Sequence, residues 1–151
     1  MERVFLSLGS NLGDRTGNVE RALNLIASVP GVRVVRASSL YETEPEGYVD
    51  QPDFINAAVE IETTLTPHKL LGEIKEIERS MGRKKTFRFG PRIIDVDILL
   101  FGGLIIDEPD LVIPHPLMLE RRFVLMPLAE IAPQTLHPIS GKTIDSHRKN
   151  I

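Results

Sequence analysis

Hydrophobic and polar positions follow two different periods along the first part of the chain, which predicts alternating strands and helices. Val4 to Leu8 is a short apolar run, and such a run predicts a buried strand. Apolar residues then recur at helical spacing, in a helix that Asp14 caps and Pro30-Gly31 ends. Residues 32–43 are rich in β-branched side chains and predict a second strand.

The two periods return in the middle of the chain. Apolar and polar residues alternate over residues 55–61, which predicts a strand with one buried face. Thr66-Pro67 begins a second helix, whose apolar stripe runs to Met81 and whose C-cap candidate is Gly82. A basic loop follows, and residues 93–101 predict a fourth strand.

The predicted order is β-α-β-β-α-β, the split βαβ pattern of a ferredoxin-like α+β fold with an antiparallel sheet. Both helices should cover one face of the sheet, and we call the opposite face the free face. Beyond Phe101, a proline-rich segment leads into a helical pattern around residues 123–131. We expect this extension to cover part of the free face as a third layer (α-β-α), within a single domain of residues 1–151.

The segment GPRIIDVDILLF contains a pair of carboxylates on the last predicted strand. Alternate residues of a strand share a face, so Asp95 and Asp97 should stand on the free face, about 7 Å apart. The alternate apolar residues from Ile94 to Leu100 should face the helices. Two neighbouring carboxylates repel each other, and Mg²⁺ with oxygen ligands would offset that cost. The alternative is a solvated face whose aspartates pair with lysines.

Five cations within ten residues precede this pair. Together with the carboxylates they predict a phosphate chain held by metal on one side and by guanidinium groups on the other. Without the carboxylates, such a loop would indicate a solvated surface or a nucleic-acid patch. Gly90-Pro91 suggests a hinge, and the loop itself a mobile lid. The cations are Arg83, Lys84, Lys85, Arg88 and Arg92.

A possible ring-binding surface lies on the neighbouring strand. Asn56 shares its face with Phe54, and Ser7 should leave room between Asn56 and the carboxylates if the first strand lies between the third and fourth. A carboxamide both donates and accepts, as the edge of a purine-like or pterin-like ring requires, and an aromatic side chain would stack on the ring. The alternative is a structural asparagine that closes a loop.

Two further side chains, His115 and Glu78, each have a functional and a structural interpretation. His115 stands between two prolines, and a lone histidine is often structural, but Arg121 and Phe123 follow closely and would add a cationic and a stacking surface. Glu78 falls in the last turn of the second helix, where a negative charge opposes the helix dipole. It either pairs with a neighbouring arginine or faces the site.

Composition excludes several classes of protein. The 151 residues carry a formal net charge of −3, which disfavours nucleic acid held through its phosphates, and there is no cysteine for a disulfide or thiolate site. The chain lacks the P-loop and Rossmann glycine patterns. With no signal peptide and no membrane-length apolar stretch, we expect a cytoplasmic protein without nucleic-acid or membrane partners. A ferredoxin-like RNA-binding module is the non-enzymatic alternative, but stacked aromatics would be expected there instead of carboxylates.

Five segments of the chain resemble the 6-hydroxymethyl-7,8-dihydropterin pyrophosphokinase family of folate biosynthesis. They span residues 6 to about 133, and the fold implied by the resemblance is the ferredoxin-like α-β-α arrangement predicted above. The segments are LGSNLGD, the run from Ser38 to Tyr41 with Thr43 and Pro45, QPDFINAAV, GPRIIDVDILLFG, and IPHPLMLERRFVLMPLAEIAP.

The resemblance implies roles for particular residues. Asp95 and Asp97 look like ligands of two Mg²⁺ ions, and Arg83 and Arg92 look like the arginines that stabilise the transferred group. Phe89 stands where some members carry tryptophan, and Asp110 where some carry arginine. The implied ATP contacts are Lys85, Phe89, Arg92, Ile98, His115 and Arg121; the implied pterin contacts are Thr43, Glu44, Pro45, Phe54, Asn56 and Phe123.

The implied reaction is attack by the hydroxymethyl oxygen of the pterin on the β-phosphorus of ATP. AMP leaves and the pterin diphosphate forms, with no covalent enzyme intermediate. The substrates are therefore ATP and 6-hydroxymethyl-7,8-dihydropterin, and we expect the enzyme to be a monomer. A metal-dependent nucleotidyltransferase that uses the same aspartates, and releases pyrophosphate, is the alternative enzyme. Nothing functional is assigned to the tail after Pro138.

Overall fold

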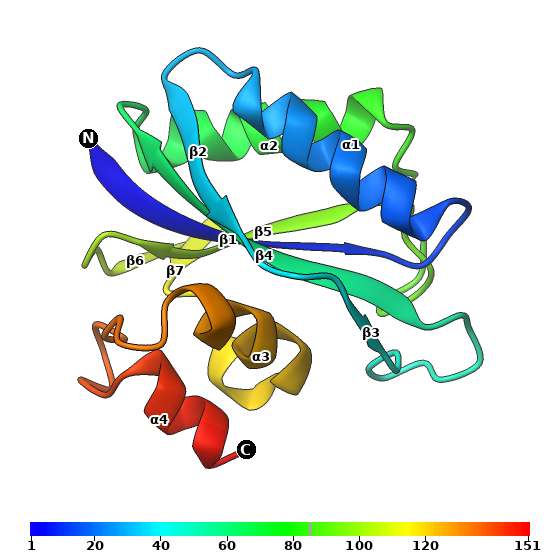
Figure 1. Cartoon of the computed structure of the whole chain (residues 1–151). Coiled ribbons are helices and arrows are strands. Elements are labelled where there is room, and N and C mark those ends of the chain that lie inside the picture. Colours follow the sequence, from blue (N-terminus) through cyan, green and yellow to red (C-terminus); the bar gives the residue numbers. More distant parts are fainter. Residues whose placement is uncertain (85) are drawn as a thin grey trace.

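An antiparallel sheet forms the centre of the molecule (Figure 1). The structure is a computed structural model that describes residues 1–84 and 86–151. The strand order is β2-β4-β1-β5, and β3 pairs with β4 beyond the end of β2. This order is the ferredoxin-like one, with the first strand between the third and fourth predicted strands, as expected. The strands are β1 (Glu2–Ser10), β2 (Val32–Ala37), β3 (Tyr41–Thr43), β4 (Phe54–Thr63) and β5 (Asp95–Phe101).

Two helices cover one face of this sheet, which confirms the predicted layer (Figure 1). In α1 (Arg15–Ala27), the Asp14 side chain caps the start by accepting a hydrogen bond from the Gly17 N–H at 3.1 Å. In α2 (Pro67–Ser80), the Thr66 hydroxyl accepts one from Lys69 N–H. As predicted, α1 ends before Pro30-Gly31, at Ala27. The C-cap of α2 is Met81, one residue before the predicted Gly82, which has a φ of +86°.

The predicted second strand, residues 32–43, is divided into β2 and β3. At the break, the Ser38 hydroxyl accepts a hydrogen bond from the Ala58 N–H at 2.9 Å, while Ser38 N–H donates to the Ala58 carbonyl at 2.8 Å. A side chain therefore replaces one main-chain ladder bond. β3 and the residues before it are also hydrogen-bonded to Glu130 in the C-terminal part of the chain. The Glu130 carboxylate accepts hydrogen bonds from Tyr41 Oη at 2.6 Å and from Ser39 N–H at 2.9 Å.

β5 differs from the predicted fourth strand in its start and in one face. It begins at Asp95 rather than Ile93. The pairing with β1 shifts between Leu100 and Ile98, so Leu99 is the extra residue of a β-bulge. The prediction that Leu100 faces the helices is therefore wrong: Leu99 and Leu100 both pack into the core on the free face, whereas Ile98 packs under the helices.

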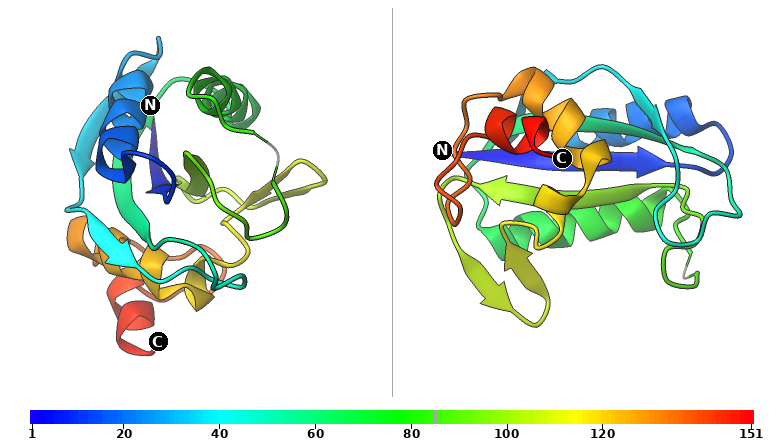
Figure 2. Two further views of the ribbon diagram at one scale, coloured as in Figure 1. Left: turned by 90° about the vertical axis from the view of Figure 1, so that its right-hand side faces the viewer. Right: turned by 90° about the horizontal axis from the view of Figure 1, so that it is seen from below.

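The C-terminal part of the chain forms the expected third layer (Figure 2). Leu125 and Leu128 of α3 (Arg122–Ile131) pack with Phe5 of β1 against the free face. Two short strands between β5 and this layer were not predicted, since three residues are too few to establish a period. The remaining elements are β6 (Ile106–Glu108), β7 (Leu111–Ile113), the 3₁₀ helix η1 (Met118–Glu120) and α4 (Ile144–Lys149).

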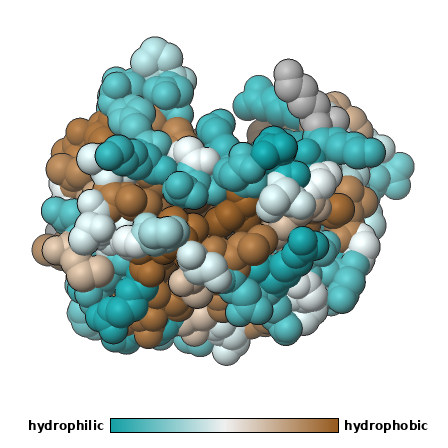
Figure 3. Space-filling model, turned by 90° about the horizontal axis from the view of Figure 1, so that it is seen from above, coloured by the Kyte–Doolittle hydropathy of each residue, from teal (hydrophilic) through white to brown (hydrophobic). Residues whose placement is uncertain are grey.

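Seen from the side of α1 and α2, hydrophobic residues form a band bordered by hydrophilic side chains (Figure 3). The layer between helices and sheet has its own core, which includes Ile26, Ile61, Leu70 and Ile74. Within the described part of the chain, none of the helices has both the length and the apolar character needed to cross a membrane.

Candidate active site

The carboxylates and the predicted ring-binding residues meet on the free face of the sheet. In the strand pairing, Gly9 of β1 lies between Asn56 of β4 and Asp95 of β5. Two residues along β1, Ser7 lies opposite Asp97. Because neighbouring strands are about 4.8 Å apart, the backbone positions of Asn56 and Asp95 are about 10 Å apart, with only a glycine between them.

A cavity opens above this part of the sheet. Its lining also includes Ser7, Gly9, Glu46 and Gly90, which were not proposed as contacts from the sequence. Ten of the predicted site residues line it: Thr43, Glu44, Phe54, Asn56, Phe89, Arg92, Asp95, Asp97, Arg121 and Phe123.

The other predicted residues lie elsewhere. Arg83 and His115 border the carboxylates without lining the cavity, since Arg83 Nη2 is 3.4 Å from Asp95 Oδ1 and His115 Nε2 is 3.9 Å from Asp97 Oδ2. Pro45 lies in the loop after β3. Ile98 is buried under the helices, on the opposite face from the carboxylates, so the structure does not bring it into the cavity. Lys85 lies outside the described residues.

The carboxylate pair, Asp95 and Asp97, is an incompletely neutralised anionic site. Burial, together with the negative charges of Asp95 and Glu78, raises the pKa of Asp97 to about 7, against the opposing charges of Arg121 and Arg83. The two aspartate side chains keep 39% and 38% of their surface exposed, so water can reach them. Oxygen ligands, excess negative charge and access for water are what a hard divalent cation requires, and the pair fits Mg²⁺ on each count.

Glu78 links α2 to the edge of the site. It is buried, and its carboxylate accepts hydrogen bonds from the Val96 N–H at 2.9 Å and from Arg83 Nη1 at 3.2 Å. Burial raises its pKa despite these contacts. Of the two interpretations of Glu78, pairing with a neighbouring arginine is confirmed, and the pairing also holds the start of the basic loop (residues 83–92) against β5.

Two arginines carry buried donors without acceptors. The Nε atoms of Arg83 and Arg121 are buried and make no hydrogen bond within the described part of the chain. Arg121 Nε lies 3.1 Å from Glu46 Oε2, in a direction unsuitable for a hydrogen bond. A buried unpaired guanidinium donor costs stability, and an anionic ligand would supply the missing acceptors.

A second cavity is lined mainly by cationic side chains and meets the first at Arg92. One side comes from α2 and the other from the start of the basic loop. Arg92 lines both cavities, so it stands at the boundary between the cavity of the carboxylate pair and the basic one. The other lining residues are Lys75, Glu78, Arg79, Arg83, Lys84 and Thr86.

His115 is held as a neutral hydrogen-bond donor. Its Nδ1 accepts a hydrogen bond from the Leu117 N–H at 3.2 Å, so the neutral ring carries its proton on Nε2, the atom that faces Asp97. Burial, aided by the charge of Arg121, lowers the pKa of His115 to about 4. The imidazole can therefore donate to an anion near the carboxylates without adding a charge.

The ring-binding end of the cavity is rigid. Asn56 is 97% buried, and its Nδ2 donates a hydrogen bond to Thr43 Oγ1, which fixes the direction of the carboxamide. Phe54 and Phe123 line the cavity from the sheet and from the third layer. The Arg121 guanidinium lies over the Phe123 ring, 5.4 Å from its centre. Polar groups of fixed direction between two aromatic rings suit a flat heterocycle.

Sequence reasoning missed the residues that join the loops around the cavity. The buried Asn11 side chain accepts a hydrogen bond from the Arg92 N–H at 2.7 Å and donates to Gln51 Oε1 at 2.8 Å. Gln51 Nε2 donates to the Phe89 carbonyl at 2.6 Å. These contacts join residues 38 to 81 positions apart, which periodicity cannot detect. Asn11 lies within LGSNLGD, so the resemblance of this motif was the sequence signal that could have indicated its role.

Phe89 has an unusual backbone conformation at the same junction. Its φ is +59°, a region that bulky residues rarely adopt. Its ring packs against Gly47, where a Cβ atom would approach the ring to 2.6 Å. Gly47 itself has a φ of +78°. The contact therefore requires glycine at position 47, and it brings the loop after β3 against the basic loop.

The site combines paired carboxylates, arginine donors without acceptors and a cavity with aromatic side chains, and this combination defines an enzyme that acts on phosphates. Comparison with known proteins identifies its family. The sequence model of 7,8-dihydro-6-hydroxymethylpterin-pyrophosphokinase (HPPK) matches residues 5–133. The chain belongs to this family.

Curated relatives agree over nearly the whole chain. A 2-amino-4-hydroxy-6-hydroxymethyldihydropteridine pyrophosphokinase of Methylorubrum extorquens is 47% identical over 95% of this chain and 90% of its own. The Bacillus subtilis protein of the same name is 48% identical over 87% of this chain and 78% of its own. The chain also matches the folic acid synthesis protein fol1 of Pneumocystis carinii at 44% identity, but spans only 20% of its length.

Solved structures share the fold. The HPPK-DHPS of Plasmodium falciparum, in a triple mutant with SDX-DHP, superposes with a TM-score of 0.79 over 99% of this chain and 44% of its own. The sequence identity is 21%, so this likeness concerns the fold alone. It agrees with the ferredoxin-like sheet and third layer described above.

Proposed function

We propose that this cavity transfers the pyrophosphoryl group of ATP to the hydroxymethyl oxygen of 6-hydroxymethyl-7,8-dihydropterin, with AMP as the leaving group. Family membership supports the reaction, and one observation of the structure supports its location. Gly9 lies between Asn56 and Asp95 across the sheet. Because glycine has no side chain, it leaves space in the cavity between the Asn56 carboxamide, which would bind the pterin edge, and the Asp95 carboxylate.

The pterin would lie over Gly9 between Phe54 and Phe123. Its polar edge would meet the carboxamide of Asn56, and the loop of Thr43, Glu44 and Pro45 would close that end. The hydroxymethyl substituent would then point across β1 toward the carboxylate pair. A bicyclic ring matches the span of about 10 Å between the two positions.

ATP would bind with its phosphates between the carboxylates and the basic cavity. Asp95 and Asp97 would hold Mg²⁺, as two ions, which neutralise the phosphate charge and polarise the β-phosphorus when bound. Arg121 and Arg83 have donors free for phosphate oxygens. His115 would donate from Nε2, and Phe89 and Lys85 would complete the nucleotide contacts, whereas Ile98, buried under the helices, is left out.

In the reaction, the hydroxymethyl oxygen loses its proton to solvent water and forms a bond to the β-phosphorus. The bond from this phosphorus to the oxygen shared with the α-phosphate breaks, and AMP leaves with the electron pair of that bond. Arg92 stands between the two cavities, where it can follow the charge that moves onto the leaving AMP. Arg83 is held near Asp95 through Glu78 and would stabilise the same charge. Holding both substrates in line removes much of the entropy cost of a bimolecular reaction.

Product analysis tests this proposal against the nucleotidyltransferase alternative. The chain is incubated with ATP, MgCl₂ and the hydroxymethyldihydropterin, and ³¹P NMR follows the phosphorus species. Pyrophosphoryl transfer gives AMP and a pterin diphosphate in equal amounts. Release of free pyrophosphate with a nucleotidylated pterin would contradict the proposal. A reaction without pterin controls for simple hydrolysis of ATP.

We further propose that residues 1–151 act as one domain and as a cytoplasmic monomer. The residues that line the cavity come from the strands, loops and third layer of one chain, so the proposed site can form within a monomer. Nucleic acid and membranes are not among the proposed partners, since the net charge is −3 and the chemistry of the cavity suits small molecules. Sedimentation at micromolar concentration, with and without substrates, tests the monomer.

A further inference from the structure

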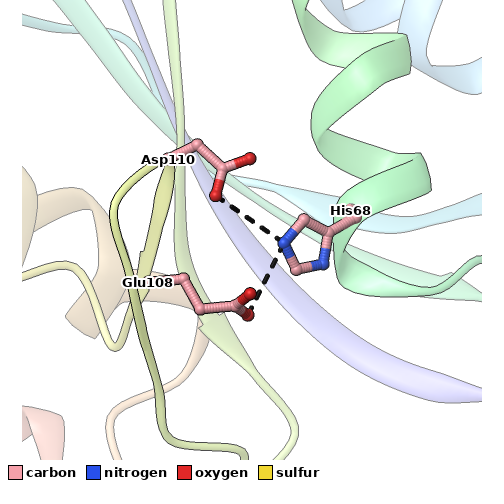
Figure 4. A group of neighbouring side chains, drawn as sticks. All are labelled: His68, Glu108 and Asp110. Atoms are coloured by element: carbon pink, nitrogen blue, oxygen red, sulfur yellow. Dashed lines mark ion pairs between the residues drawn. The ribbon is translucent and has the colours of Figure 1, made fainter.

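A second group of ligand-type side chains lies where the β6–β7 hairpin meets the start of α2. His68 is in the first turn of α2, Glu108 ends β6, and Asp110 lies in the turn to β7. Figure 4 shows the imidazole facing both carboxylates. We propose that these three side chains form a surface site for a divalent transition-metal cation such as Zn²⁺, separate from the carboxylate pair.

The distances suit a shared ion better than direct hydrogen bonds. His68 Nε2 is 3.6 Å from Glu108 Oε2 and 3.8 Å from Asp110 Oδ1, and all three ligand atoms lie within 4.8 Å of one another. Good N–H···O hydrogen bonds are about 2.7–3.2 Å long. Two ligands that each lie about 2.1 Å from one tetrahedral ion are about 3.4 Å apart. Small rotations of these exposed side chains would complete that geometry.

The mixed ligand set indicates the class of metal. Magnesium prefers oxygen ligands and keeps much of its water, whereas imidazole nitrogen with carboxylate oxygen suits zinc, cobalt or nickel. All three side chains are about half exposed, at 47%, 51% and 66%, so water can fill the remaining coordination position. None of the three lines either cavity near the carboxylate pair.

Local charge favours a cation at this place. Among the residues that the structure describes, neither Glu108 nor Asp110 forms an ion pair with a lysine or arginine, and their one basic neighbour is His68. With a neutral imidazole, the group therefore carries two adjacent negative charges. A divalent ion would offset this repulsion and would use the nitrogen lone pair that a proton otherwise occupies.

Metal binding at this site should stabilise the contact between the β6–β7 hairpin and α2. The ligands come from segments about 40 residues apart, and β7 is anchored by Leu111 and Ile113 in the core under the helices. A ligand that binds only the folded chain stabilises it by mass action. We therefore expect Zn²⁺ to raise the thermal unfolding temperature through this site.

Calorimetric titration of the metal-free full chain with ZnCl₂ tests the site, with His68→Asn and Glu108→Gln as the variants. Because the carboxylate pair can also bind Zn²⁺, the matched control is Asp107→Asn. Asp107 is exposed, precedes Glu108 on β6 and points to the other side of that strand. We expect both ligand variants to lose one Zn²⁺ equivalent, or to bind it at least about tenfold more weakly. Asp107→Asn should match the unmodified chain.

Identical titrations for the unmodified chain, His68→Asn and Glu108→Gln would overturn the proposal. A second measurement needs no variant: in the ¹⁵N-labelled chain, Zn²⁺ should shift the Nε2 resonance of His68. A resonance that stays unmoved while other sites fill with Zn²⁺ would also overturn it. Thermal unfolding with Zn²⁺ should show the stabilisation in the unmodified chain and in Asp107→Asn, and its loss in His68→Asn.

Discussion

The two faces of the central sheet differ most clearly along β1. Toward the helices, Val4, Leu6 and Leu8 are all large and fully buried. Toward the third layer, the side chains shrink from Phe5 to Ser7 to Gly9. Phe5 packs against α3, while Ser7 and Gly9 line the cavity. One strand thus holds the core together with one face and makes room for substrate with the other.

β5 shows the same division through charge. Val96 and Ile98 are buried under the helices, whereas Asp95 and Asp97 repel each other on the free face. The apolar face contributes hydrophobic burial, and the acidic face costs stability until a cation binds. The apolar core behind the sheet therefore offsets the free energy that the acidic site costs. Substitutions on the apolar face should mainly change stability, whereas substitutions on the acidic face should mainly change activity.

The largest effect is expected when the acidic face loses one charge. Asp97→Asn keeps the shape of the side chain but removes a ligand, so turnover should fall about 1,000-fold or more while the fold remains. AMP release measures turnover, and circular dichroism checks the fold. Asp107→Asn, with the same chemical change far from the cavity, should keep full activity. Full activity in Asp97→Asn would show that the carboxylate pair does not hold the metal.

The next largest effect concerns the boundary between the two cavities. Arg92→Ala should lower kcat about 100-fold and change ATP affinity much less, because its proposed contact forms mainly in the transition state. Arg33→Ala is the control, since Arg33 is exposed, pairs with Glu62 and lines neither cavity. If Arg92→Ala weakens ATP binding as much as it slows turnover, then Arg92 only anchors the substrate.

The sheet face that α1 and α2 cover could be predicted from the sequence, because local periodicity determines which residues lie on it. The apolar residues of α1 and α2, and the alternation in β4, recur within a few positions, and the core confirms them. The bulge at Leu99 could not be predicted, because it depends on how β5 pairs with a strand about ninety residues earlier in the chain. The β6–β7 hairpin was missed because each strand has three residues.

The site was predictable where strand alternation or a motif places the side chain. Asp95, Asp97 and Asn56 lie on the expected face because each follows the two-residue period of its strand. Asn11 and Gln51 act through hydrogen bonds between distant loops, and no local pattern reports them. Their contacts depend on the relative position of three loops, which only the folded structure defines.

A smaller effect is expected from filling the floor of the cavity. A Cβ atom at Gly9 would lie 2.7 Å from Asn56 Oδ1, so Gly9→Ala must displace the carboxamide or the strand. Pterin affinity should fall about tenfold while ATP affinity stays nearly unchanged, as separate calorimetric titrations would measure. Gly72→Ala is the matched control, because no atom lies within 4 Å of its added carbon. Equal losses for both ligands would contradict the division of the free face.

The smallest effect links pH to the stability of the metal-free chain. The pKa of Asp97 rises from 3.8 in the unfolded chain to about 7 in the folded one. The folded state therefore binds a proton more strongly, and this group lowers stability as pH rises from about 4 to 7. The full shift corresponds to about 4 kcal/mol, but with 38% of the side chain exposed, screening reduces it to about 1 kcal/mol.

Urea unfolding of the unmodified chain and of Asp97→Asn, in EDTA at pH 5 and pH 8, measures this difference. The stability gained by Asp97→Asn should be about 0.6 kcal/mol larger at pH 8 than at pH 5, because asparagine carries no charge to repel Asp95 and about two of the three pH units between the two pKa values lie in this range. Subtracting the two chains removes the opposite contribution of His115, whose pKa is lowered by burial. Adding Mg²⁺ at pH 8 should stabilise only the unmodified chain. A pH-independent difference would mean that Asp97 is charged in both states, and that the acidic face does not strain the fold.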